Sequence, residues 1–183
     1  MRNREELMFP RIRTGRIRIG MMPATPEELY ARLETLGIET VTYTHPPLST
    51  VAESRRLRGD IPGGHCKNLF LRTKKKGSWL VVMLEDRALD LKALGRLLGV
   101  GPLSFGRPER LMACLGVSPG EVTPFALIND VEREVNVVLD QEMLAYTPLN
   151  YHPLVNTATV SIMPEDLLTF IRSCGHEPHV MAL

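Results

Sequence analysis

A lysine and an asparagine begin an otherwise apolar segment, in which Lys67 and Asn68 precede Leu69, Phe70 and Leu71. Alternate side chains of a β-strand share a face, so we expect Lys67 to point the same way as Leu69 and Leu71. A partly buried ammonium is costly unless it meets an anion or a polarised oxygen, which makes Lys67 a candidate for chemistry. The alternative is a solvated lysine at the end of a strand.

Two histidines are further candidates for contact with a substrate. His152 precedes Pro153, and the residue before a proline is held in extended backbone; a structural loop histidine is the alternative. His65 lies two residues before Lys67. Cys66 follows His65, but the sequence places no base that would activate its thiol, so a cysteine nucleophile is disfavoured.

Basic side chains lie on both sides of this segment. Arg55, Arg56 and Arg58 precede its glycine-rich entry, and Lys74–Lys76 follow the apolar run. Both groups could contact nucleic-acid phosphates, while a solvated helix end and a solvated hairpin turn are the alternatives. We retain the three arginines as candidates for substrate binding.

Most standard catalytic signatures are absent from the sequence. It contains no P-loop, no GxGxxG after a strand and no HExxH. The three cysteines form no CxxC pair and have no metal-ligand spacing. We therefore expect neither a metal nor a cofactor.

Capping signals and apolar spacing predict the elements that position these residues. Thr25 and Glu28 form a capping box before a helix that ends at Gly37. A second capping box, at 50–53, predicts a short helix through Arg58. Two apolar runs around a polar turn predict a hairpin of 66–73 and 78–84. Further helices are expected at 90–98, at 107–115 and from 164, and further strands at 38–44 and near 123–128, 135–140, 157–162 and 177–182.

The expected strands form hairpins, and helices interrupt them at irregular intervals. This order favours an α+β fold over a doubly wound parallel sheet. We expect a mixed, mostly antiparallel sheet or a partly closed barrel, flanked by helices.

Length and charge indicate one domain with a basic extension. Of the 183 residues, 1–20 contain six arginines and two glutamates, net +4, which leaves 16 basic and 19 acidic residues, net −3. We therefore assign 1–22 to an extension and 23–183 to a single domain. A net-acidic body argues against broad coating of nucleic acid. The sequence lacks both an apolar run of about 18 residues and the apolar stretch of a secretory signal, so a cytoplasmic protein without a membrane span is expected.

Several motifs occur together over most of the chain. They are Lys67-Asn68-Leu69-Phe70-Leu71, Gly106-Arg107-Pro108-Glu109-Arg110-Leu111, Leu115-Gly116-Val117-Ser118-Pro119-Gly120, Val122-Thr123-Pro124-Phe125 and His152-Pro153-Leu154-Val155-Asn156-Thr157. In this order they resemble the YbaK and prolyl-tRNA-synthetase-associated editing superfamily, from about residue 24 to 183. The Lys-Asn pair, rather than the Lys-Thr of the cysteinyl-tRNA(Pro) deacylases, is similar to the free-standing, alanine-specific branch.

The resemblance implies an editing domain that hydrolyses mischarged Ala-tRNA(Pro), with the tRNA acceptor end as partner and prolyl-tRNA synthetase as a further one. It implies that Lys67 engages the terminal adenosine phosphate or the aminoacyl group, and that a ribose hydroxyl of the substrate helps to activate water. We expect Asn68 and backbone amides near Gly120 to hold the carbonyl oxygen, and His152 to position the ribose or the water.

Two alternatives remain open at this point. The same chemistry could act on serine, threonine or cysteine, because the sequence defines pocket size poorly. A non-catalytic nucleic-acid-binding or regulatory protein could use the same fold together with the arginines of 1–22.

Overall fold

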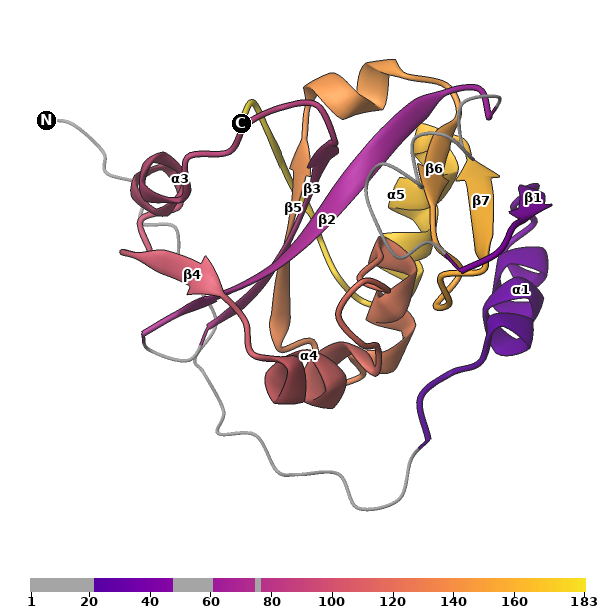
Figure 1. Ribbon diagram of the computed structural model, residues 1–183, viewed down its shortest axis with the longest axis horizontal. Helices are drawn as coiled ribbons and strands as arrows, with labels where there is room; N and C mark the ends of the chain where they lie inside the picture. Colours follow the sequence, from indigo (N-terminus) through magenta and orange to yellow (C-terminus); the bar gives the residue numbers. More distant parts are fainter. Residues whose placement is uncertain (1–21, 48–60, 75–76) are drawn as a thin grey trace, which may run out of the picture.

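The computed structural model describes residues 22–47, 61–74 and 77–183, which form a twisted sheet flanked by helices (Figure 1). The helices are α1 Pro26–Thr35, α3 Leu91–Leu97, α4 Pro108–Leu115 and α5 Pro164–Ser173, with the short 3₁₀ helices η1 Pro124–Asn129 and η2 Glu142–Ala145. The strands are β1 Val41–Thr44, β2 Gly64–Thr73, β3 Ser78–Leu84, β4 Leu103–Phe105, β5 Val135–Asp140, β6 Leu149–Tyr151, β7 Ala158–Ile162 and β8 His179–Met181.

The eight described strands form one open sheet in the order β1-β7-β6-β2-β3-β5-β8, with β4 paired to β2. The pairs β1–β7, β6–β7, β2–β3 and β2–β4 are antiparallel, whereas β2–β6, β3–β5 and β5–β8 are parallel. The α+β class and the mixed, mostly antiparallel sheet are therefore confirmed. Of the two predicted forms, the described strands adopt the open sheet rather than the barrel.

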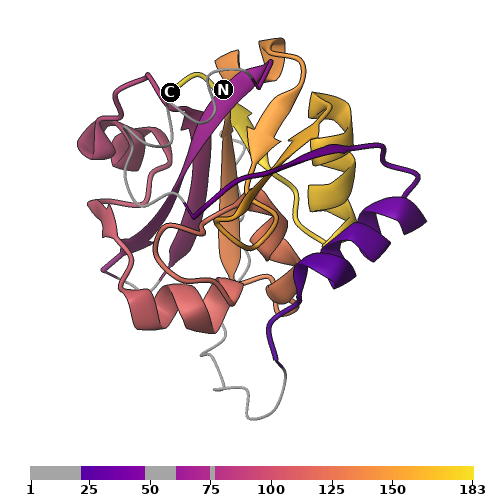
Figure 2. The ribbon, with the colours of Figure 1, turned by 45° about the vertical axis from the view of Figure 1, so that its right-hand side comes forward.

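The two faces of the sheet are covered unequally. Side chains of α1, α4 and α5 join the larger core around Phe70, Leu80 and Val82. The smaller core, around Leu71 and Trp79, packs against α3 on the other face. Figures 1 and 2 show α3 apart from the other helices. The long strand β2 runs between the two cores and contributes alternate side chains to each.

Side-chain caps begin α1 and α3, whereas α4 and α5 begin with a proline and have no side-chain cap. The Thr25 hydroxyl accepts from the Glu28 N–H, and the Glu28 carboxylate accepts from the Thr25 N–H, so the predicted capping box of α1 is confirmed. The hairpin of β2 and β3 is confirmed as well. The predicted helix at 50–58 lies outside the described residues.

One predicted strand, at 123–128, is wrong. Residues Pro124–Asn129 form the 3₁₀ helix η1 instead. The Thr123 hydroxyl accepts from the Phe125 N–H, and Pro124 occupies the first position of the helix. The run from Pro124 to Leu127 is buried on all sides, so its continuous apolar character resembled that of a buried strand.

None of the described helices is long and apolar enough to cross a membrane.

Candidate functional site

Lys67 and Asn68 occupy opposite faces of β2. Lys67 shares its face with Leu69 and Leu71, as predicted, because these residues alternate along the strand. Its ammonium donates to the carbonyl oxygen of Glu85, at 3.2 Å, and to that of Arg87. Asn68 points to the other face, where it lines a cavity. The structure does not bring these two side chains together, and a catalytic role for Lys67 stays a prediction.

A small polar cavity lies beside Asn68, where β2 meets β6 and β7. We call it the inner cavity; its volume is about 20 Å³. It is lined by His65, Cys66, Asn68, Asn150, Tyr151, His152 and Thr159. About 10–15 Å³ is needed to hold one water molecule, so the cavity admits a single group of that size. Three of the predicted site residues, His65, Asn68 and His152, therefore meet at one place.

Backbone carbonyls orient both histidines of the inner cavity. His65 Nε2 lies 3.1 Å from the Ile61 oxygen, and His152 Nδ1 lies 3.1 Å from the Ala158 oxygen. A carbonyl oxygen only accepts, so these two ring nitrogens carry the protons. His65 Nδ1 is then an acceptor, and it is buried without a hydrogen-bond partner. The Oδ1 atom of Asn68 is also buried and unpartnered, so the cavity offers two vacant acceptors to a ligand or a water molecule.

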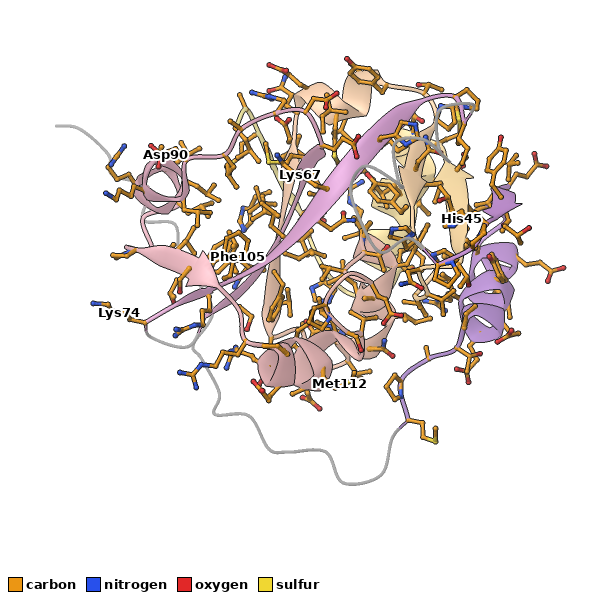
Figure 3. All side chains as sticks on the ribbon, in the orientation of Figure 1. His45, Lys67, Lys74, Asp90, Phe105 and Met112 are labelled. Atoms are coloured by element: carbon orange, nitrogen blue, oxygen red, sulfur yellow. The ribbon has the colours of Figure 1, made fainter. Side chains whose placement is uncertain are left out.

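His45 is a residue at this site that the sequence reasoning missed. Its ring centroid lies 6.4 Å from that of His152, edge to face. Its Nδ1 donates to the Pro46 oxygen at 2.9 Å, so its Nε2 accepts from the Thr159 hydroxyl at 3.0 Å. Figure 3 shows His45 next to β1 and β7. A signal was present in the sequence, because His45 precedes a proline just as His152 does.

The entry to β2 is fixed by close backbone contacts with β6. Gly63 has φ +102°, and a Cβ there would lie 2.1 Å from the Pro148 oxygen. The Gly64 N–H donates to the same oxygen at 2.8 Å. The Asn150 amide donates to the Pro62 oxygen at 2.9 Å and accepts from the Ser161 hydroxyl at 2.5 Å. These bonds hold His65 and Asn68 against β6 and β7.

Burial keeps two ionisable side chains of the cavity neutral. Burial raises the pKa of the Cys66 thiol to about 12, so the thiol is protonated at neutral pH. This argues against Cys66 as a nucleophile, because the thiolate is the reactive form. Burial also raises the pKa of Tyr151 well above its ordinary value, and its hydroxyl contacts the Met143 sulfur at 3.7 Å.

A larger hollow adjoins the inner cavity, and we call it the outer pocket. Its volume is about 180 Å³, and its walls are mostly apolar. Its lining includes Asn68, Leu69, Phe70, Phe105, Gly106, Pro108, Leu111, Pro119, Gly120 and Val122. Gly120, a predicted substrate contact, therefore lies near Asn68 but does not line the cavity with the histidines. Asn68 lines both hollows.

The predicted phosphate contacts are only partly described. Arg55, Arg56, Arg58, Lys75 and Lys76 lie outside the described residues. Lys74 is exposed at the end of β2, far along the strand from Lys67 (Figure 3). Within the described ranges, no group of three His, Cys, Asp or Glu side chains is placed to hold a metal ion.

Comparisons with known proteins identify relatives in sequence and in fold. A family model described as an aminoacyl-tRNA editing domain matches residues 45–170. Prolyl-tRNA synthetase associated domain-containing protein 1 of Bos taurus is 40% identical over 158 residues, which cover 84% of this chain and 92% of that protein. The prolyl-tRNA editing protein ProX of Acetoanaerobium sticklandii is 34% identical over 151 residues, which cover 82% and 92%. A solved structure described as a candidate trans-editing enzyme for prolyl tRNA synthetase matches with a TM-score of 0.65 and 23% identity, over 86% of this chain and 96% of that one, and shows the same fold.

Proposed function

Because the chain belongs to the aminoacyl-tRNA editing domain family, we propose that it is a trans-editing deacylase that hydrolyses the ester of mischarged Ala-tRNA(Pro). Two relatives carry names that refer to prolyl-tRNA editing or to prolyl-tRNA synthetase. Those names support tRNA(Pro) as the nucleic acid. Prolyl-tRNA synthetase, which produces the mischarged tRNA, is the proposed protein partner.

The size of the inner cavity is the observation that supports alanine as the amino acid removed from the tRNA. A synthetase pocket built for proline cannot strongly exclude a smaller apolar residue, since each missing methylene is worth about 1–3 kcal/mol. A second site can reject the larger, correct residue by its shape. The inner cavity has a volume of about 20 Å³, which suits a methyl-sized group and not a pyrrolidine ring.

The proposed reaction is ester hydrolysis by water, without a covalent enzyme intermediate. The water oxygen bonds to the carbonyl carbon, the bond to the ribose oxygen breaks, and that oxygen leaves as a hydroxyl with a proton from the water. The Asn68 amide, with backbone N–H groups near Gly120, holds the carbonyl oxygen while negative charge develops there. His152 positions the water or the substrate's ribose hydroxyl. His65 Nδ1, a buried vacant acceptor, contacts the substrate beside it.

The remaining predicted contacts concern the tRNA backbone. Arg55, Arg56 and Arg58 are proposed to bind acceptor-stem phosphates, because phosphate contacts supply most of the affinity for nucleic acids. Lys67 keeps its proposed contact with the terminal adenosine phosphate or the aminoacyl group through the family resemblance alone, since its ammonium meets backbone carbonyls in the structure.

A deacylation screen tests the proposed function. The protein is incubated with tRNA(Pro) that carries labelled alanine, serine, threonine or cysteine, and loss of the label is followed against buffer alone. Alanine should be released fastest. Fastest release of another amino acid would keep the chemistry and correct the substrate, whereas no release above buffer hydrolysis would refute the deacylase.

A further inference from the structure

The outer pocket is open at the edge of the sheet and carries an exposed aromatic ring. Phe105, the last residue of β4, is 63% exposed although it lines this pocket. Gly106 lets the chain pass close to Phe70, because a Cβ at that position would lie 2.3 Å from the Phe70 ring. Figure 3 shows Phe105 at the end of β4, the strand that pairs with the last residues of β2. An aromatic surface therefore faces solvent directly beside Asn68.

The edge of β2 next to this pocket has no partner strand within the described residues. On this side β2 pairs with β6 only at Gly64 and His65, and with β4 only from Leu71 to Thr73. The Gly64 N–H bonds toward β6, and the Phe70 oxygen accepts from Gly106. Main-chain groups alternate in direction along a strand. The N–H and C=O groups of Asn68 therefore point into the gap between β6 and β4.

The main-chain N–H donor and C=O acceptor of Asn68 match the hydrogen-bonding groups of adenine. Adenine presents an amino donor next to a ring-nitrogen acceptor. Proteins that bind single-stranded RNA stack unpaired bases on aromatic side chains and read their edges with hydrogen bonds. Arg107, which is exposed and follows Gly106, adds a cation at the rim for the adjoining phosphate.

We propose that the outer pocket binds the terminal adenine of the tRNA acceptor end, stacked on Phe105 and read by the main-chain N–H and C=O groups of Asn68. The inference rests on the proposed function, because the methyl group of the alanyl ester then occupies the inner cavity. Asn68 lines both hollows. The ester that joins the ribose of the terminal adenosine to the amino acid therefore lies next to the Asn68 amide. Binding of the adenine thereby holds the ester next to Asn68 and His152.

Binding of uncharged tRNA(Pro) to the full chain tests this subsite independently of catalysis. Fluorescence anisotropy compares tRNA(Pro) with its truncated form that lacks the terminal adenosine. The wild type should bind the intact tRNA about tenfold more tightly, from one stacked base. Phe105→Ala should lose that preference, and Phe105→Trp should retain it. Equal binding of the two tRNAs by the wild type would overturn the inference, whether or not the protein deacylates.

A matched variant and an altered base complete the test. Met112 is 44% exposed on α4 but does not line the pocket, so Met112→Ala should behave as the wild type. In deacylation, Phe105→Ala should raise KM for Ala-tRNA(Pro) about tenfold and leave kcat nearly unchanged. Replacing the terminal adenine by purine, which lacks the amino group, should raise KM in the wild type. If Phe105→Ala instead alters the choice between alanine and proline and not the dependence on adenine, the pocket holds the amino acid and the inference is wrong.

Discussion

At the scale of single residues, the inner cavity combines groups that are far apart in the sequence. Asn68 and His65 come from β2 and His152 follows β6. His45, which follows β1, does not line the cavity but lies against His152. Each of the three histidines has one ring nitrogen close to a backbone carbonyl, at 2.9–3.1 Å. Such contacts select the tautomer, and therefore which nitrogen can accept a hydrogen bond. The cavity is thus polar, small and preorganised.

Cys66 provides a test of the mechanism without a covalent intermediate. We predict that Cys66→Ala retains deacylation within a few-fold of the wild type, because the thiol lines the cavity as a neutral group. Its pKa is raised to about 12 from an ordinary 9.0, so the native state keeps a proton that the unfolded chain releases. The thiol's contribution to stability is therefore complete below pH 9 and declines as the pH rises toward 12. Urea unfolding at pH 8 and pH 10.5 should show a larger loss in the wild type than in Cys66→Ala, and a 100-fold loss of deacylation in a folded Cys66→Ala would contradict the mechanism.

Lys67 is the residue whose predicted role and observed contacts differ most. We predict that Lys67→Ala remains folded and is nearly inactive, because the family resemblance places this lysine on the substrate. Lys92, exposed on α3, gives the matched control, and Lys92→Ala should keep full activity. The measurements are single-turnover deacylation and the thermal midpoint. A Lys67→Ala protein with full activity and a lowered midpoint would assign this ammonium to anchoring the Glu85 and Arg87 carbonyls instead.

At the scale of elements, the site depends on how β2 enters the sheet. We predict that Gly63→Ala lowers both stability and deacylation, because the new methyl group would meet the Pro148 oxygen at 2.1 Å with φ at +102°. The backbone conformation alone costs about 1–2 kcal/mol for a residue with a side chain. Gly99→Ala is the matched control, since Gly99 has φ +68° and nothing within 4 Å of a Cβ. Chemical unfolding should show a clearly larger loss for Gly63→Ala, and equal losses would mean that the contact with Pro148 is unimportant.

Sequence patterns predicted the helices and strands that have a local capping, proline or apolar-run signal. The capping box at Thr25, the apolar runs of the β2–β3 hairpin and the proline-led helices α4 and α5 all formed as expected. The three-residue strands β4 and β6 were missed, whereas β8, of the same length, was predicted as part of a longer segment at 177–182. The strands β4 and β6 pair with β2 on either side of Asn68 and leave the edge of Asn68 unpaired. The outer pocket therefore depends on tertiary structure and could not be predicted from local sequence patterns.

The site residues were likewise predicted where a local pattern places them and missed where a long-range contact does. Alternation along β2 correctly predicted that Lys67 shares a face with Leu69 and Leu71. The same alternation directs Asn68 to the opposite face, so two neighbours in one motif need not share one pocket. His45 was missed because its contact with Thr159 joins residues 114 positions apart.

At the scale of the whole molecule, the predicted division at residue 22 can be tested directly. We predict that deleting residues 1–21 leaves the thermal midpoint and deacylation unchanged, because the described core begins with Ala24 bound through its N–H to the Asn129 side chain, at 2.8 Å. The deletion removes six arginines. In a filter-binding titration, affinity for nucleic acid that disappears with these residues, in a protein without deacylation, would favour the non-catalytic alternative.

The selectivity between alanine and proline tests the central claim most directly. The measurement is kcat/KM for Ala-tRNA(Pro) and for Pro-tRNA(Pro), in the wild type and in Asn68→Ala. The account predicts that the wild type hydrolyses the alanyl ester at least 100-fold better than the prolyl ester, since the inner cavity excludes the larger ring. Asn68→Ala should remain folded and lose about 10²–10³-fold in kcat on Ala-tRNA(Pro), the effect of removing one donor to a developing oxyanion. Equal hydrolysis of the two esters by the wild type, or full activity of Asn68→Ala, would contradict it.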